Sequence, residues 1–268
     1  LKWDIEQFMP TLELYRGLTY ESEGSDLIVW PEVAIPGLYR NLGEYLSEIQ
    51  DWADVNGSEV MLGILRGDPE RNAVQNTIVT LGETRDFYIK RHLVPYGEYF
   101  PVPDFARNWL RLMSLPYNDV RPGPEGQAPL EIAGQLVAAS ICYEDVFGSE
   151  QLHYLPDSTL LVNVSNDAWF GDSIAPHQHL QIARVRAAEA GRYMLRATNT
   201  GVSGIIDPAG GLIAISPQFE PHVLRATVRG YSGTTPYVRW GNYAVVIACL
   251  LVLFGQFLTT KFTIRPGT

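Results

Sequence analysis

The sequence predicts a layered α/β or α+β domain. Short apolar runs alternate with helix-like patterns along most of the chain and hairpin patterns follow, which is typical of strands and helices packed in layers. The chain has 268 residues, of which 46% are hydrophobic, so it can bury one large core or two modest ones. This composition excludes a disordered chain.

The first part of the chain contains four predicted strands and one predicted helix. The helix is expected at residues 41–57, because its apolar residues fall on one face and Gly57 provides a stop. The last two strands form a pair that is joined by a glycine-containing turn. The strands are expected at residues 26–32, 59–67, 76–82 and 86–93.

The second part continues the alternation and ends in hairpins. A helix rich in small residues is expected at 177–192, and the turn of a hairpin is expected at 207–211. A final strand at 222–230 should close the sheet. Strands are expected at residues 135–142 and 158–166, and the hairpin at 203–216. Because no internal repeat or low-complexity linker interrupts this pattern, residues 1–230 are expected to form one domain.

Residues 100–123 leave two interpretations open. Prolines stand early in the segment, and Phe105, Trp109 and Leu112 then share one helical face. The segment is either an ordinary surface helix packed on the core or a mobile amphipathic arm that touches lipid.

Residues 240–260 carry no charge, and a helix that spans a membrane needs about 20 apolar residues. Trp240 and Tyr243 stand at one end as an aromatic belt would. We therefore expect a transmembrane helix here, a linker at 231–239 and a cytoplasmic tail at 261–268. A buried core helix is the alternative.

Charge and cysteine content narrow the function further. The formal net charge is −10, and no basic cluster with interleaved aromatic residues occurs, which argues against nucleic-acid binding. Two cysteines cannot form a disulfide framework, and a bridge between Cys142 and Cys249 is not expected. His177 and His179 look like a metal pair, but they do not share a helical face and no third ligand stands out, so no metal is expected.

Three predicted strands end in reactive side chains, namely Glu32, Lys90 and Cys142. A cysteine nucleophile needs a base, and a carboxylate shielded from water can take its proton. A lysine ammonium, together with a backbone N–H, can stabilise the oxyanion of acyl transfer. The three residues therefore form a complete set of base, oxyanion donor and nucleophile.

Several motifs resemble the nitrilase superfamily, also called the carbon–nitrogen hydrolases. They are WPE at 30–32, YIKRHLVPYGEYFP at 88–101, ICYEDVF at 141–147 and NVSNDAWFG at 163–171. The stretch at 166–210 is most similar to one branch, the apolipoprotein N-acyltransferases of bacteria. This resemblance runs over essentially the whole chain and corresponds to the C-terminal portion of those proteins.

The resemblance implies an αββα sandwich and a role for each residue of the set. It carries over Glu32 as the base, Lys90 as the oxyanion partner and Cys142 as the nucleophile. It also implies that Glu98 is a second essential carboxylate near Lys90. The alternative is a structural role, in which Glu98 only stabilises a turn. The family has membrane helices and a first core strand ahead of the part matched here, and we expect that these segments are missing from this chain.

Other matched positions have weaker expectations. Tyr143 and Glu144 match functionally important positions beside the nucleophile, while Asp145 is expected to favour the first turn of a helix. Asn166, Asp167 and Trp169 are expected to form a loop near the substrate pocket, and the alternative is that this loop has a purely structural role. Substrate or lipid contacts are expected from Trp3, Trp109, Asn166 and Trp169.

By resemblance, the expected function is transfer of a fatty acyl group from a phospholipid, through a cysteine thioester, to the N-terminal amine of a diacylglyceryl-cysteine apolipoprotein. The reaction needs no cofactor, metal or nucleotide. The expected location is the bacterial inner membrane, with the catalytic domain on the outer, periplasmic face. The alternative is a carbon–nitrogen hydrolase that cleaves an amide or nitrile with the same three residues.

Overall fold

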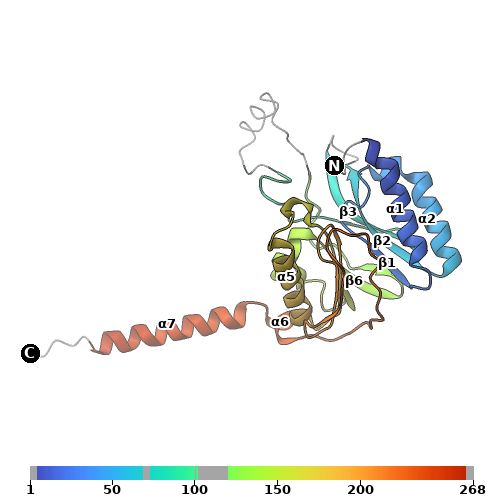
Figure 1. Cartoon of the computed structure of the whole chain (residues 1–268). Coiled ribbons are helices and arrows are strands. Elements are labelled where there is room, and N and C mark those ends of the chain that lie inside the picture. Colours follow the sequence, from blue (N-terminus) through green and yellow to red (C-terminus); the bar gives the residue numbers. More distant parts are fainter. Residues whose placement is uncertain (1–4, 69–72, 100, 102–119, 264–268) are drawn as a thin grey trace, which may run out of the picture.

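The computed structural model describes residues 5–68, 73–99, 101 and 120–263, and two mixed β-sheets lie face to face at its centre (Figure 1). The first sheet has the order β1-β2-β3-β4. Its strands are β1 (Leu27–Trp30), β2 (Glu59–Gly67), β3 (Val74–Leu81) and β4 (Phe87–Ile89). β1 and β2 run parallel, and the other two pairings are antiparallel.

The second sheet has six strands in the order β10-β9-β8-β7-β6-β5. Its three central strands, β6, β7 and β8, are parallel to one another, and the outer pairings are antiparallel. The strands are β5 (Leu130–Ile132), β6 (Gln135–Ile141), β7 (Leu160–Asn166), β8 (Met194–Asn199), β9 (Gly204–Ile206) and β10 (Leu212–Ile215).

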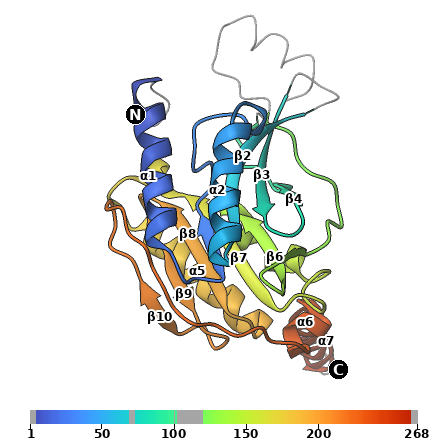
Figure 2. The same ribbon diagram turned by 90° about the vertical axis from the view of Figure 1, so that its right-hand side faces the viewer.

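Helices cover the outer faces of both sheets. α1 (Phe8–Glu21) and α2 (Gly43–Asn56) pack on the first sheet, and α5 (Ala175–Ala190) packs on the second (Figure 2). The expected α/β fold with an αββα order of layers is therefore present. The remaining short helices are η1 (Ile5–Gln7), η2 (Tyr39–Asn41), η3 (Cys142–Val146), α4 (Gly148–Gln151), η4 (Asp167–Phe170) and α6 (Pro236–Trp240).

The core between the two sheets explains why the central strands are continuous apolar runs. Met61 and Ile78 from the first sheet pack against Val137, Ile141 and Val162 from the second, and each of them is 0% exposed. Strands that are covered on both faces do not alternate between polar and apolar residues. Burial of this kind contributes about 25 cal/mol per Å² of apolar surface, which holds the sheets together.

The direction of the strands gathers polar residues at one end of the molecule. β6, β7 and β8 point the same way, so the residues at their carboxyl ends meet at one edge of the second sheet. Glu32 follows β1 and Lys90 follows β4, and the carboxyl ends of these strands lie at the corresponding edge of the first sheet. This edge is where open α/β sheets place their ligands.

Several elements differ from the prediction. Residues 222–230 form no strand, and most of their side chains are exposed or half-buried, so no buried face fixes a register against the sheet edge. The strand expected at 86–93 ends at Ile89, and α5 lies two residues earlier than expected. α1 and β5 were not predicted. Most of the segment 100–123 lies outside the described residues.

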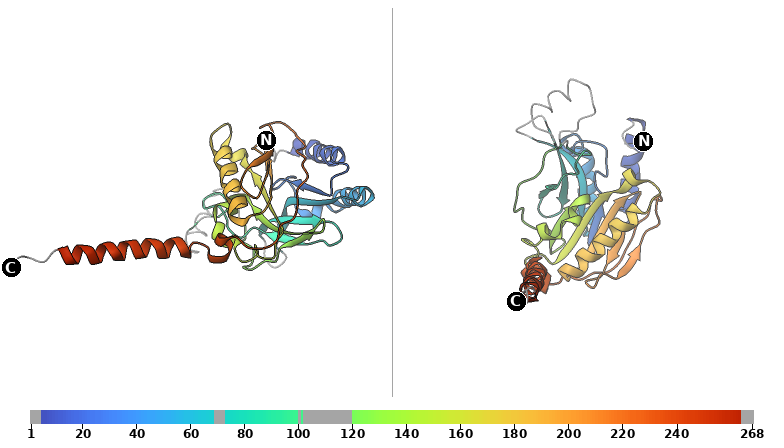
Figure 3. Two further views of the ribbon diagram at one scale, coloured as in Figure 1. Left: turned by 90° about the horizontal axis from the view of Figure 1, so that it is seen from below. Right: turned by 90° about the vertical axis from the view of Figure 1, so that its left-hand side faces the viewer.

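The prediction of a transmembrane helix at 240–260 is not supported. Gly241, with a φ of 54°, separates α6 from α7 (Tyr243–Thr263), so the helix begins later than the apolar run. In the part of the chain that the structure describes, no helix combines the length and apolarity needed to cross a membrane. α7 extends away from the sheets (Figures 1 and 3).

Candidate active site

The candidate nucleophile, Cys142, lies where β6 turns into η3. Its φ angle is 52°, in the left-handed region that costs a non-glycine residue about 1–2 kcal/mol. Such a conformation persists only where the surrounding contacts fix it. The residues that hold this turn, which we call the nucleophile turn (residues 141–144), are therefore part of the site.

Glu144 fixes the nucleophile turn from one side. Its Oε2 accepts hydrogen bonds from the Ile141 N–H at 2.7 Å and from the Tyr88 hydroxyl at 3.0 Å. Its Oε1 accepts a hydrogen bond from the Arg91 N–H at 2.7 Å. Burial raises the pKa of Glu144 to about 7, although its backbone donors act to lower it. Glu144 thus ties the turn to the segment that follows Lys90.

Glu32 is held in place by contacts to its backbone. A Cβ atom at Gly63 on β2 would lie only 2.6 Å from the Glu32 Cα, so the close approach of these two segments requires glycine. The Asn199 side chain, at the end of β8, donates a hydrogen bond to the Glu32 carbonyl oxygen. Asn199 in turn accepts a hydrogen bond from the Tyr15 hydroxyl of α1 at 2.9 Å. Three separate elements therefore position Glu32, which is 5% exposed.

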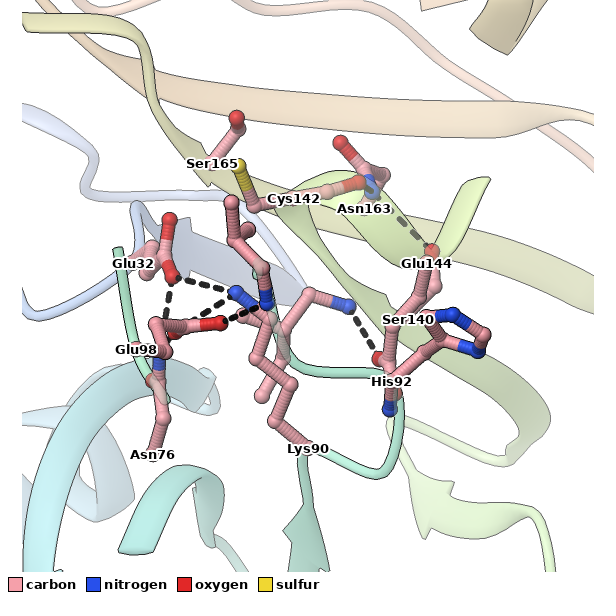
Figure 4. Close-up of polar contacts among 12 residues, drawn as sticks. Glu32, Asn76, Lys90, His92, Glu98, Ser140, Cys142, Glu144, Asn163 and Ser165 are labelled. Carbon is pink, nitrogen blue, oxygen red and sulfur yellow. Dashed lines mark hydrogen bonds and ion pairs between the residues drawn. The ribbon is translucent and has the colours of Figure 1, made fainter. Parts of the chain in front are cut away.

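Lys90 is buried between two carboxylates. Its Nζ lies 2.8 Å from Glu98 Oε1 and 3.3 Å from Glu32 Oε1 (Figure 4). The Asn76 side chain, from β3, donates a hydrogen bond of 2.6 Å to the same Glu32 oxygen. Burial acts to lower the pKa of Lys90, but Glu32 and the other acidic neighbours raise it above its usual value. Lys90 is therefore an ammonium at neutral pH.

Glu98 makes contacts that fit both interpretations of its role. Its Oε2 accepts a hydrogen bond of 2.8 Å from the Val94 N–H, and its own N–H donates to the Val94 carbonyl oxygen. It therefore closes a turn and also binds Lys90. A carboxylate that is fixed in this way holds the lysine ammonium in one position.

The surroundings of Cys142 favour a protonated thiol. Burial, followed by the negative charge of Glu32, raises the pKa of the Cys142 thiol to about 12. Lys90, the Ser165 hydroxyl and the Asn166 N–H act in the opposite direction but do not reverse the shift. Cys142 is therefore a thiol at neutral pH, and an attack by its sulfur would require a base to take the proton.

An aromatic cluster adjoins the nucleophile turn. The Tyr143 ring contacts His92 and Phe147 edge-on, with centroid distances of 5.8 Å and 5.0 Å. His92 stacks on Phe147 at 3.6 Å, and its Nδ1 lies 3.0 Å from Glu150 Oε1. These contacts fix the side chain of Tyr143, whose backbone N–H directly follows the nucleophile.

A second set of charged side chains lies on the other side of the turn. Asp145 occupies the first turn of η3, as expected, but its buried carboxylate contacts His179 and Arg196. His179 also contacts Asp167, whereas His177 is exposed, so the two histidines lie in different surroundings. These four buried charges were not predicted as a cluster.

The residues predicted to contact substrate have different positions. Asn166 directs its backbone N–H at Cys142, and its side chain accepts a hydrogen bond from the Ala168 N–H. Trp169 on η4 is 79% exposed. Trp3 and Trp109 lie outside the described residues.

Sequence reasoning missed the asparagines that bind Glu32. Asn76 lies in a strand and is 4% exposed, and a buried amide of this kind needs hydrogen-bond partners. That rule is the only signal by which Asn76 was recognisable, because its contact with Glu32 spans 44 positions of sequence.

Comparisons with known proteins agree with this geometry. Residues 1–237 match the family model of the carbon–nitrogen hydrolases. The chain is 44% identical over 249 residues to the apolipoprotein N-acyltransferase of Methylococcus capsulatus, which covers 92% of this chain and 49% of that protein. It is 43% identical over 259 residues to that of Nitrosomonas europaea, with coverages of 96% and 52%. The expected resemblance is confirmed, and the chain spans about half the length of the curated relatives it matches.

Solved structures share the fold at low sequence identity. An amidase from a Nesterenkonia species aligns with a TM-score of 0.61 and 18% identity, over 90% of each chain. A carbon–nitrogen hydrolase from Helicobacter pylori aligns with a TM-score of 0.58 and 14% identity, over 82% of each chain. At these identities, the likeness shows the fold alone.

Proposed function

Because the chain belongs to the carbon–nitrogen hydrolase family, we propose that it catalyses acyl transfer through a covalent intermediate on Cys142. The names of the curated relatives, which are apolipoprotein N-acyltransferases, give an apolipoprotein amine as the acceptor, and the phospholipid and the diacylglyceryl-cysteine come from the motif resemblance described above. The acyl donor is a phospholipid, and the acceptor is the N-terminal amine of a diacylglyceryl-cysteine apolipoprotein. The observation that carries the chemistry is the buried network of Glu32, Lys90 and Glu98 beside the Cys142 thiol.

In the first half of the reaction, Cys142 Sγ attacks the carbonyl carbon of the phospholipid ester. Glu32 takes the thiol proton, because the raised pKa of Cys142 leaves no thiolate at rest. Lys90 Nζ and the Tyr143 N–H stabilise the oxyanion of the tetrahedral intermediate. The carbon–oxygen bond then breaks, and the lysophospholipid leaves with the proton from Glu32, which leaves a thioester on Cys142.

In the second half, the amine of the apolipoprotein attacks the thioester carbonyl carbon. Glu32 takes a proton from the amine, the carbon–sulfur bond breaks, and the proton returns to Cys142 as the amide forms. Asn76 and Lys90 both bind Glu32 Oε1, so we assign the proton transfers to Oε2. No metal or nucleotide takes part.

The alternative is a hydrolase that uses the same three residues on a small amide. The shared fold with an amidase favours this reading at the level of the fold only. In that reaction ammonia leaves in the first half, and water replaces the amine in the second. The two functions therefore differ in the acyl donor and in what resolves the thioester.

Both proposed substrates carry lipid chains, so we place the reaction at the bacterial inner membrane. α7 exposes apolar side chains, among them Val245 at 67%, Leu251 at 66% and Phe254 at 60%. A continuous apolar surface of this kind is unfavourable in water, and we propose that it contacts lipid. We further propose that the catalytic part, residues 1–230, acts on the outer, periplasmic face.

The test is the intact mass of the protein, in the full form that its gene encodes, after incubation with phospholipid vesicles. We expect a fatty-acyl adduct on Cys142 that hydroxylamine removes and that disappears when a diacylglyceryl lipopeptide is added. The Cys142→Ser variant serves as the control, because an oxygen ester would resist hydroxylamine under the same conditions. Release of ammonia from small amides without any lipid adduct would contradict acyl transfer.

A further inference from the structure

His179 lies beside the nucleophile turn and between two aspartates. It belongs to α5; its Nδ1 lies 3.0 Å from Asp167 Oδ1 and its Nε2 lies 3.0 Å from Asp145 Oδ1. Because an ionised carboxylate only accepts hydrogen bonds, both ring nitrogens carry protons and the side chain is an imidazolium. Burial acts to lower the pKa of His179, but the hydrogen bonds to the two aspartates raise it to about 9.

Arg196 completes a cluster in which the charges balance. From β8, its Nη2 lies 3.0 Å from Asp167 Oδ2 and its Nη1 lies 3.5 Å from Asp145 Oδ2. Two cations thus face two carboxylates, and none of the four side chains is more than 9% exposed. Removal of one charge from such a cluster leaves another charge buried without compensation.

The cluster reaches Cys142 by two routes. His179 Nε2 lies 3.2 Å from the Cys142 carbonyl oxygen. The Ser165 hydroxyl bonds to Asp167 at 3.0 Å and also lies in hydrogen-bonding contact with the Cys142 sulfur. The cluster therefore contacts the backbone of Cys142 directly and reaches its thiol through Ser165.

We propose that His179 is a positioning residue, which binds the Cys142 carbonyl oxygen and thereby keeps the nucleophile turn in the orientation that directs Sγ toward Glu32. The role in acyl transfer rests on the proposed function. The physical reason is the left-handed conformation of Cys142, which needs support on both sides. Glu144 binds the N–H of Ile141 ahead of the nucleophile, and His179 binds the carbonyl group of Cys142 itself.

The test uses alkylation of Cys142 by iodoacetamide, followed by intact mass, because this reaction needs no lipid substrate. The sulfur–carbon bond forms, the carbon–iodine bond breaks, iodide leaves and Glu32 takes the thiol proton. A Cys249→Ser background leaves Cys142 as the only thiol of these 268 residues, and the mass of the peptide that contains Cys142 identifies the alkylated site. The variants are His179→Gln, Glu32→Gln and their combination, and His177→Gln is the matched control because His177 is exposed on the same helix.

We expect His179→Gln to slow alkylation on the order of 10²-fold, because a displacement of about 1 Å has effects of that size. His177→Gln should keep the parent rate. Glu32→Gln should strongly lower the alkylation rate of the parent. Added to His179→Gln, it should change the alkylation rate less than threefold, since a displaced thiol no longer uses Glu32. The proposal would be overturned if His179→Gln reacted at the parent rate. It would also be overturned if the rate reduction in the double variant equalled the product of the two single reductions.

Two further measurements separate a positioning role of His179 from a role in folding and from the acyltransferase function. If His179→Gln does not fold, His179→Gln with Asp145→Asn restores the charge balance of the cluster, and the same rate comparison applies. Failure of both variants to fold would assign His179 to domain stability and would contradict a specific role at the turn. A parent protein that is alkylated normally but takes no acyl group from phospholipid would remove the acyltransferase function and leave the positioning role intact.

Discussion

Two buried polar networks flank Cys142, and they differ in their charge balance. On the side of the first sheet, the single cation Lys90 lies between the carboxylates Glu32 and Glu98. On the side of the second sheet, His179 and Arg196 face two aspartates. The first network has one carboxylate more than its cation can neutralise, whereas the second is balanced.

Under the proposed mechanism, this difference favours one of the two networks for the exchange of a proton. The surplus carboxylate of the first network has no cation of its own, so a proton that it accepts leaves no buried cation without a partner. Any change of protonation in the balanced network would instead leave a buried charge without its partner. We therefore assign proton transfer to the network of Glu32 and Lys90, and support of the backbone to the network of His179 and Arg196.

The largest expected effect follows from removal of the cation of the first network. Lys90→Met should lower the rate of acyl-adduct formation by about 10²–10³-fold, because the oxyanion loses a charged donor. The rate is measured by intact mass, and folding by circular dichroism.

Arg91→Met is the matched control for Lys90. It stands one position later, and its guanidinium pairs at 2.8 Å with Glu125, which is 84% exposed. Surface ion pairs of this kind contribute little to stability, so the variant should react at the parent rate. A normal burst of acylation in Lys90→Met would remove Lys90 from the mechanism.

A smaller effect is expected in the pH dependence of stability. The folded state raises the pKa of His179 from 6.5 to about 9. The contribution of His179 to the free energy of unfolding is therefore complete below pH 6.5 and is lost as pH rises toward 9. Its size is on the order of 3 kcal/mol. Urea unfolding at pH 6 and pH 9 should show this loss in the parent and in His177→Gln. An equal loss in His179→Gln would show that His179 does not cause it.

The sequence proposed the candidate reactive residues but not the residues that support them. Glu32, Lys90 and Cys142 each end an apolar run within a recognisable motif, and the structure brings Glu32 and Lys90 within 3.3 Å. Asn76 and Asn199 carry no such mark, because their contacts with Glu32 arise only when distant strands meet.

The fold followed the apolar pattern where both faces of a strand are buried. β2, β3, β6 and β7 lie where continuous apolar runs predict them. The pattern predicted a strand at residues 222–230, where alternation occurs without a buried face, and no strand forms there. It gave no prediction for α1, although that helix is amphipathic. It also could not indicate that Gly241 separates α6 from α7, so that the long helix begins later than the apolar run.

The most direct test of the account is the protonation state of Cys142 at rest. The infrared S–H stretching band, taken as the difference between the parent and Cys142→Ser, reports this state without interference from Cys249. A thiol with its pKa raised to about 12 should show the full band at pH 7 and at pH 9, where a free cysteine is already mostly thiolate. Loss of the Cys142 band at pH 7 would mean that the nucleophile is a preformed thiolate, and it would contradict proton transfer to Glu32.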